Sequence, residues 1–161
     1  CRSDALAAGA SREKEVIRKW QKFSDLSLDD LYEIMVIRQN VFTVEQNIVY
    51  LDADGKDRVS WHLSFWQGDS IAAYLRVLPA GEKYAEVAIG RVATAPEARG
   101  KGIGKELMRE ALLRIEKEFG RGPIRISAQS YLEKFYKDFG FEIVGEPYIE
   151  EGIPHIEMLR N

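Results

Sequence analysis

A glycine-rich turn, Arg99-Gly100-Lys101-Gly102-Ile103-Gly104, carries the clearest chemistry in the sequence. It separates the apolar stretch 86–94 from a segment whose apolar residues recur at helical spacing until Gly120. Glycines let the backbone approach a ligand closely, and the first amides of a helix have no partner within it. Arg99 and Lys101 add cationic side chains. The turn therefore predicts an anion site suited to a pyrophosphate.

Two nucleotide-binding motifs do not fit this turn. A dinucleotide fingerprint counted from Gly100 and Gly102 requires a third glycine where Lys105 stands. A Walker A loop requires Ser or Thr after Gly104-Lys105, and the chain has Glu106 there. An ordinary tight turn with surface charges remains the alternative to an anion site.

Composition narrows the class of protein. The chain has 161 residues, 45% of them hydrophobic, and a net charge of -3, which suits one domain with its own core. It has no basic stripe for nucleic acid and no apolar run near the ~20 residues of a membrane span. A single cysteine, Cys1, and two histidines, His62 and His155, do not suffice for a metal cluster. We therefore expect no metal, no nucleic acid and no membrane partner, with the cytoplasm as the default location.

Hydrophobic spacing predicts the helices and strands that surround the glycine turn. We expect residues 1–16 to be a flexible N-terminal tail or non-native residues, and residues 17–161 to form a single domain. Helices are predicted from Ser27 through the apolar residues up to 42, from 103 to 119, and from a Ser130–Glu133 capping box to Gly140. Strands are predicted at 20–23, 60–66, 71–78, 86–94, 124–128, 141–144 and 155–159, the last two joined by an acidic loop. Gly90 within 86–94 indicates a bulge or a close backbone approach. The predicted fold class is mixed α/β.

At several places the sequence resembles the GCN5-related N-acetyltransferase (GNAT) superfamily. Arg99, Gly102 and Gly104 match the pyrophosphate loop of that family, and Phe135-Tyr136 followed by Gly140-Phe141 matches a second motif. Four further blocks resemble an ElaA-like bacterial subgroup: Arg38 with 41–46, then 52–57, 127–129 and 152–156. Together the matches extend over about residues 17 to 160.

The resemblance implies a single central sheet, mixed but mostly antiparallel, with helices on both faces. Its strands at 87–94 and 124–128 would splay apart and receive acetyl-CoA as a cosubstrate. Gln129 stands where many members carry Asn, which puts that contact to coenzyme A in doubt. The residues assigned to cofactor binding are Arg91, Val92, Ala93, Thr94, Arg99, Gly100, Lys101, Gly102, Ile103, Gly104, Lys105, Gln129 and Tyr136.

The implied reaction moves an acetyl group to a primary amine by direct attack in a ternary complex. Tyr136 is the candidate general acid for the leaving sulfur, and aromatic packing beside Phe135 and Phe139 is its alternative. Glu45 and His155 are candidates for the base or for a substrate contact. The substrate assignments are Arg38, Phe42, Glu45 and Glu157.

Structural explanations compete with several of these roles. Glu45 could instead form a buried pair with Arg38. His155 could instead cap or pack. The acidic stretches 52–54 and 150–151 could attract a cationic amine or be solvated loops.

Two other functions compete with catalysis of amine acetylation. One is a module that binds CoA or acyl-CoA without turnover. The other is an acyl-homoserine-lactone-type synthase, which the length of the chain disfavours. The acceptor, a small molecule or a peptide amine, is left open, and a homodimer is expected only by analogy with the superfamily.

Overall fold

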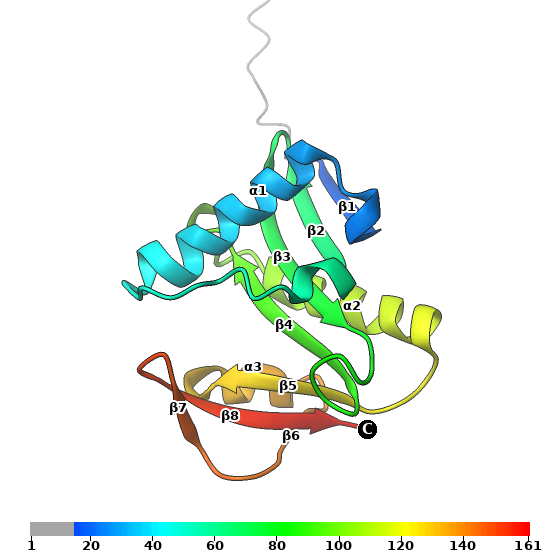
Figure 1. Cartoon of the computed structure of the whole chain (residues 1–161), viewed down its shortest axis with the longest axis vertical. Helices are drawn as coiled ribbons and strands as arrows, with labels where there is room; N and C mark the ends of the chain where they lie inside the picture. The colour runs from blue at the N-terminus through cyan, green and yellow to red at the C-terminus, as the bar shows by residue number, and fades with distance from the viewer. Residues whose placement is uncertain (1–14) are drawn as a thin grey trace, which may run out of the picture.

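The computed structural model describes residues 15–161. Their strands form an eight-stranded sheet in the order β1-β2-β3-β4-β5-β8-β6, with β7 paired to β8 (Figure 1). The strands are β1 (Val16–Lys22), β2 (Trp61–Gln67), β3 (Ser70–Leu78), β4 (Val87–Thr94), β5 (Ile124–Gln129), β6 (Glu142–Ile143), β7 (Tyr148–Glu150) and β8 (Ile153–Arg160). The pairs are antiparallel except β4–β5, which is parallel. The predicted mixed, mostly antiparallel sheet is therefore confirmed.

Helices cover both faces of this sheet. Helix α1 (Leu28–Arg38) crosses one face and α2 (Ile103–Phe119) lies behind the other, while the short α3 (Glu133–Lys137) lies beside β5 (Figure 1). The predicted start of α1 at Ser27 is confirmed, and it is a capping box: the Ser27 hydroxyl accepts a hydrogen bond from the Asp30 amide, and the Asp30 carboxylate accepts one from the Ser27 amide, both at 3.0 Å. The amphipathic pattern of α2 buries one face against the sheet, through Ile103, Leu107, Met108, Ala111 and Ile115.

Strands β4 and β5 are paired only near their starts. The register joins Val87 to Ile124 and ends at the pair Ile89–Ile126. Beyond this point β4 runs on to Thr94 and β5 to Gln129 without pairing to each other, and the two ribbons diverge in Figure 1. The predicted splay is present, and it leaves backbone groups of β4 without a neighbouring strand on this side.

A β-bulge lies on β4 at the opening. Between the pairs Tyr74–Ala93 and Arg76–Gly90, β4 carries one more residue than β3. Within the bulge Arg91 has a φ of 51°, in the left-handed region that non-glycine residues rarely adopt. The irregularity expected from Gly90 is present, but the left-handed residue is its neighbour Arg91.

The N-terminal strand is longer than its sequence pattern indicated. Instead of spanning 20–23, β1 already pairs at Val16 with Gln67, and Phe23 opens a 3₁₀ turn. Residue 16 therefore belongs to the sheet and not to the expected tail. Residues 1–14 of that tail lie outside the described part of the chain.

The predicted capping box at Ser130 is wrong. Ser130 opens a short 3₁₀ turn, α3 begins only at Glu133, and its N-cap is Leu132 without a side-chain hydrogen bond. The Ser130 hydroxyl is buried without a hydrogen-bond partner in the described chain. A helix that starts three residues later leaves the serine without an amide to cap.

The acidic loop before the last strand contains a strand that the sequence pattern missed. Strand β7 pairs with β8 from Tyr148–His155 to Glu150–Ile153. The turn between them is Glu151-Gly152, with φ of 50° and 74°. Two consecutive left-handed residues are typical of tight hairpins, so this dipeptide was the signal.

Helices in residues 15–161 are all too short or too polar to cross a membrane.

Candidate active site

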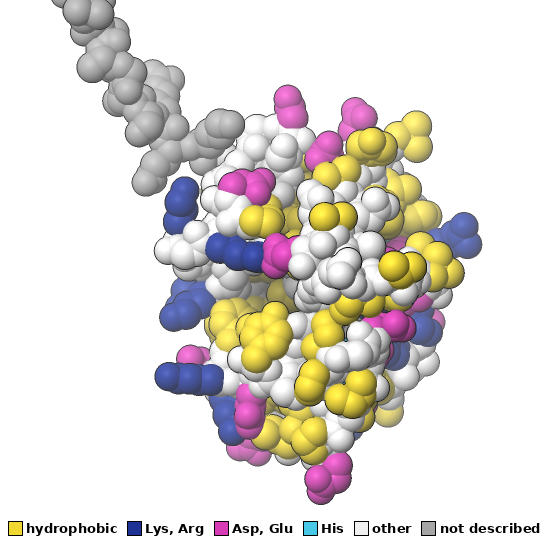
Figure 2. All heavy atoms as spheres, turned by 90° about the vertical axis from the view of Figure 1, so that its left-hand side faces the viewer, with side chains coloured by type: hydrophobic (Ala, Val, Ile, Leu, Met, Phe, Trp, Pro, Cys, Tyr) yellow, Lys and Arg dark blue, Asp and Glu magenta, His cyan; other side chains and the backbone are white. Residues whose placement is uncertain are grey.

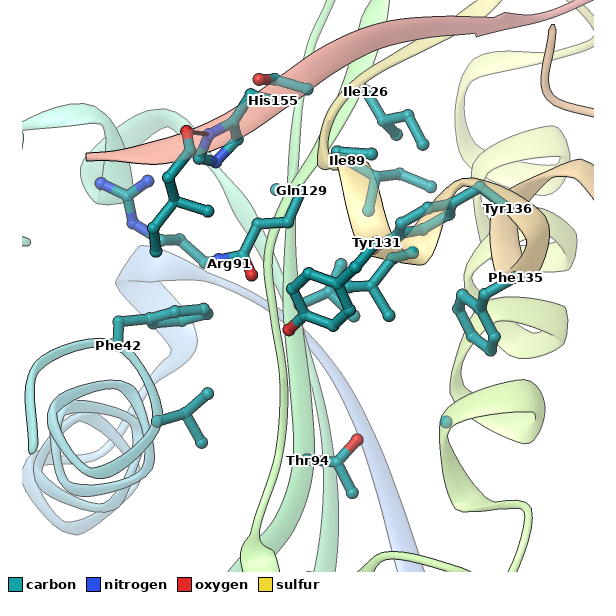
Figure 3. A pocket seen from close by; sticks show the side chains of 18 of the residues that line it. Phe42, Ile89, Arg91, Thr94, Ile126, Gln129, Tyr131, Phe135, Tyr136 and His155 are labelled. Atoms are coloured by element: carbon teal, nitrogen blue, oxygen red, sulfur yellow. Dashed lines mark hydrogen bonds between the residues drawn. The ribbon is translucent and has the colours of Figure 1, made fainter. Parts of the chain in front are cut away.

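A cavity of about 620 Å³ opens where β4 and β5 diverge, a volume typical of small-molecule sites. Its walls come from β4, the glycine turn, the end of β5, α3, the segment that follows α1, and the β7–β8 tip. Figure 3 shows these elements converging, with Thr94 toward one end and His155 toward the other. The cavity therefore joins segments that are far apart in the sequence.

Exposed apolar side chains lie on the side of the molecule where β4 and β5 diverge. Figure 2 faces this side of the molecule and shows hydrophobic side chains gathered on it. Val44, Val49, Tyr131 and Ile149 lie among or next to lining residues and are 70%, 97%, 74% and 68% exposed. Tyr131 thus adds exposed apolar surface to a lining that also contains charged residues.

The glycine turn forms one end of the cavity. Helix α2 begins after Gly102, whose φ is 77° and whose position lacks a side-chain cap, so the first amides of the helix are free for a ligand. At Gly104 a Cβ atom would lie 3.7 Å from Thr94 Oγ1 and 3.9 Å from the ring of Phe135. Arg99 and Lys105 line the cavity beside the glycines of this turn. The arrangement fits a phosphate-bearing ligand.

Tyr136 projects from α3 into the cavity lining and is 5% exposed. Its ring packs edge-on against Phe135 and Phe141, with ring centres 5.1 and 6.0 Å apart. Burial raises the pKa of the phenol above its ordinary value, so the hydroxyl stays protonated at neutral pH. The packing interpretation of Tyr136 is confirmed by these ring contacts, and its role as a general acid stays a prediction.

His155 lines the cavity from β8. Its Nδ1 lies 2.7 Å from the Ile153 carbonyl oxygen, the contact that Figure 3 marks, so in the neutral ring Nδ1 carries the proton. Nε2 then keeps its lone pair, and it lies 3.9 Å from the Glu150 carboxylate. The ring also stacks on Tyr148, with centres 5.9 Å apart. This tautomer leaves His155 able to accept a proton.

Glu45 and Phe42 reach the cavity from a π-helical segment, Gln39–Glu45, which continues α1. Such turns widen the helix and are often found at functional sites. Glu45 does not pair with Arg38, so that expectation is wrong. Its carboxylate lies 2.8 Å from the guanidinium of Arg99 in the glycine turn.

Arg38 lies in the core and does not line the cavity. It is fully buried and absent from the lining, and it lies 2.7 Å from Asp52 and 2.6 Å from Asp57. The expectation that Arg38 contacts a substrate is therefore wrong. A side chain held by two carboxylates in the core has no surface left for a ligand.

The acidic loop around Asp52 is neutralised by arginines. Asp54 lies 2.6 Å from Arg76, and Asp52 lies 2.8 Å from Arg91. Burial alone would raise the pKa of Asp57, but hydrogen bonds from Arg38 and Arg76 lower it below its usual range. Asp52 and Asp54 fasten the loop to the core through these arginines, although Ala53 and Asp54 are exposed. Attraction of a cationic amine by this loop stays a prediction.

The residues assigned to cofactor binding mostly meet at the cavity. All of them line it except Ala93, which is 1% exposed and faces the core, and Lys101, whose side chain is exposed outside it. Glu157, assigned to the substrate, is also outside the lining and lies 2.9 Å from Arg125. The expectation of a substrate contact by Glu157 is not met, because this ion pair engages its carboxylate.

Tyr50, Lys83 and Tyr84 are among the lining residues that the sequence did not indicate. Each stands in a loop without periodicity, so only the three-dimensional arrangement brings them to the cavity. The Tyr50 hydroxyl donates to Asp52 at 3.0 Å. Burial, together with the charge of Asp52, raises the pKa of Tyr50 to about 12.

Residues 15–161 contain no group of three or more His, Asp or Glu side chains arranged to hold a metal.

A splayed sheet, a glycine turn at a helix start and a buried tyrosine at one cavity define the GNAT class of fold. Residues 52–160 match the family model described as an acetyltransferase (GNAT) domain. The chain belongs to the GNAT acetyltransferase family, in its ElaA-like group.

Similar proteins support this assignment. Protein ElaA of Escherichia coli K12 is 39% identical over 146 residues, which cover 88% of this chain and 95% of that protein. The crystal structure of an acyl-CoA N-acyltransferase from Pseudomonas aeruginosa has a TM-score of 0.88 at 38% identity, with 91% of this chain and 100% of that chain covered. The crystal structure of Escherichia coli ElaA has a TM-score of 0.86 at 36% identity, with the same coverage.

Proposed function

We propose that the protein is an N-acetyltransferase that moves an acetyl group from acetyl-CoA to a primary amine by direct attack in a ternary complex. One observation carries the proposal: the free edge of β4, the uncapped start of α2 and Tyr136 all line a single cavity. A phosphate site, an unpaired strand edge and a proton donor are the parts that an acyl-CoA transfer requires. The similarity to an acyl-CoA N-acyltransferase agrees with this reading.

The chain offers a place for each part of acetyl-CoA. The free amides at the start of α2, with Arg99, would hold the pyrophosphate, and backbone groups around Val92 and Thr94 would pair with the pantetheine amides. The cosubstrate supplies an activated thioester. Tyr136 would give its proton to the departing sulfur.

We assign the base to His155 rather than to Glu45. Nε2 of His155 has a free lone pair, because Nδ1–H is bound to Ile153. The carboxylate of Glu45 is engaged by Arg99 at 2.8 Å. An amine that enters as an ammonium must lose a proton before attack, and Nε2 of His155 is the proton acceptor that this geometry offers.

The acceptor side favours an amine beside an apolar group. Glu150 and Glu151 line this end and would attract an ammonium, while the exposed ring of Tyr131 would contact the rest of the acceptor. We therefore expect phenethylamine and tyramine to be acetylated faster than ethanolamine, which has the amine without the apolar group.

The test is isothermal titration with acetyl-CoA, with NAD and ATP as controls, followed by amine-dependent release of CoA thiol. Binding of acetyl-CoA alone and thiol release with an aromatic amine would support the proposal. Binding without turnover of any amine would favour a CoA-binding module. Absence of binding would overturn the proposal.

A further inference from the structure

Two lysines line the cavity, and they stand at different ends of it. Lys105 belongs to the first turn of α2, next to Gly104 and the phosphate end. Lys83 stands in the turn between β3 and β4, and its electrostatic neighbours include Glu150 on the β7–β8 tip. Lys83 is therefore the lysine on the acceptor side.

The turn that carries Lys83 is held in place. The Gly81 amide donates to the Tyr84 carbonyl at 2.7 Å, with Gly81 at a φ of 89°. Lys56 donates to the Glu82 carbonyl at 3.2 Å, which ties this turn to the loop 52–57. The ammonium of Lys83 lies 5.3 Å from the centre of the Tyr84 ring. The backbone of Lys83 is thus fixed, while the residue as a whole is exposed on the side of the cavity that the β3–β4 turn lines.

The surroundings of Lys83 favour its neutral amine. Partial burial lowers the pKa of Lys83, and the guanidiniums of Arg91 and Arg76 lower it further. The carboxylates of Glu150 and Asp54 oppose this shift without reversing it. A lysine amine attacks a carbonyl only when it is unprotonated, so these neighbours increase the reactive fraction at neutral pH.

We propose that Lys83 is itself an acceptor, so that the protein acetylates this side chain when acetyl-CoA is bound and no external amine is present. This inference rests on the proposed function. The neutral Nζ attacks the thioester carbonyl, the new C–N bond forms and the C–S bond breaks. The sulfur takes the proton of Tyr136, and the proton that the nitrogen loses returns through water to the Tyr136 phenolate. The products are Nζ-acetyl-lysine and free CoA.

The modification would change the acceptor side. Acetylation removes one positive charge beside Arg91 and Arg76 and adds bulk to the lining. An acetylated chain is therefore expected to acetylate external amines more slowly than an unmodified one.

The experiment follows incorporation of a deuterated acetyl group from labelled acetyl-CoA into the full chain, without amine, by peptide mass spectrometry over time. Lys105 is the matched control inside the cavity, and Lys56 is the control on the neighbouring loop. Lys83 is expected to be labelled at least about tenfold faster than either, a difference that corresponds to about 1.4 kcal/mol in the barrier. Tyr136→Phe should slow this labelling, and Lys83→Arg should remove the fast phase.

Equal labelling of Lys83 and Lys56, or labelling that Tyr136→Phe leaves unchanged, would overturn the inference and indicate ordinary chemical acetylation. Titration and thiol release separate this result from a failure of the proposed function. If acetyl-CoA binds and external amines are acetylated while Lys83 stays unlabelled, only the inference about Lys83 fails. If acetyl-CoA does not bind, both fail.

Discussion

The carboxylate of Glu45 and the guanidinium of Arg99 form an ion pair at 2.8 Å that joins the π-helical end of α1 to the glycine turn. Arg99 also donates two hydrogen bonds to the Thr94 carbonyl, at 3.2 and 3.1 Å. The arginine that would contact a pyrophosphate is therefore already bound by a carboxylate. A ligand must compete with Glu45 for it.

Glu45→Gln should increase the affinity for acetyl-CoA by about two- to fivefold, because it removes this competitor and a negative charge near the phosphates. The pair is 38% and 43% exposed, and such pairs are worth about 0.2–1 kcal/mol. Isothermal titration measures the change. Arg99→Gln is the matched control and should weaken binding. If Glu45→Gln instead leaves binding unchanged and abolishes turnover, Glu45 is the base and our assignment to His155 is wrong.

Gly104→Val should abolish acetyl-CoA binding while the fold is kept. Gly104 does not have a positive φ, and an added Cβ would make only van der Waals contacts with Thr94 and Phe135. The larger side chain would, however, fill the hollow over the free amides of α2. Gly104→Ala is the graded control and should bind more weakly than wild type but measurably. Equal binding by all three proteins would show that the glycine turn is not the phosphate site.

Tyr136→Phe should lower kcat by about 10²-fold, the lower range for a general acid, without a change in Tm. The ring contacts with Phe135 and Phe141 remain in the variant. Because burial raises the pKa of Tyr136 above its ordinary value, the wild type should show no loss of rate from phenol ionisation up to about pH 10. Tyr131→Phe, at an exposed tyrosine of the same cavity, is the control. Unchanged turnover in Tyr136→Phe would leave Tyr136 a packing role only.

The features that were predicted correctly from the sequence depend mostly on residues close together in the chain. The capping box at Ser27, the glycine turn and the helix that ends at Gly120 each depend on residues within a few positions of one another. The splay of β4 from β5 followed from the family resemblance rather than from spacing. Where a short-range pattern failed, as at Ser130, the helix began later than the pattern allowed.

Ion-pair partners could not be read from the sequence. Arg38 and Glu45 are seven positions apart and near one helix, yet Arg38 pairs with Asp52 and Asp57, and Glu45 pairs with Arg99. The choice depends on which carboxylates the folded loops bring to each guanidinium. The same limit explains why Lys83 was missed, since its place at the cavity depends on the β3–β4 turn and the β7–β8 tip together.

Asp30 should make the stability of the protein depend on pH in the acid range. Burial would raise the pKa of Asp30, but hydrogen bonds from Ser27 and Lys19 lower it from 3.8 to about 2. A carboxyl with a lowered folded pKa stabilises the fold above its unfolded pKa, and this contribution is lost as the pH falls through the folded value. Asp30→Asn should therefore cost about 1 kcal/mol at about pH 6.

The cost should decrease as the pH falls from about 4 through about 2, because wild-type Asp30 becomes neutral over this range. Urea unfolding of both proteins across this range measures the difference. A constant difference at all pH values would mean that the geometry of the cap, and not the charge of Asp30, stabilises α1.

Arg38→Met should destabilise the fold by about 3–5 kcal/mol, the range for removal of one partner from a buried ion pair. The guanidinium is 0% exposed and binds Asp52 and Asp57, and its loss leaves Asp57 with Arg76 alone. Arg38→Lys keeps the charge but cannot reach both carboxylates as a planar fork does, so we expect an intermediate loss. Urea unfolding at neutral pH measures all three proteins. The exposed pair Arg121–Glu116 supplies the control, because Arg121→Met should leave the urea midpoint of unfolding unchanged.

If Arg38→Met unfolds at the same urea concentration as wild type, the network does not hold the loop 52–57. Tyr50 and the neighbouring wall of the cavity would then be positioned by other contacts.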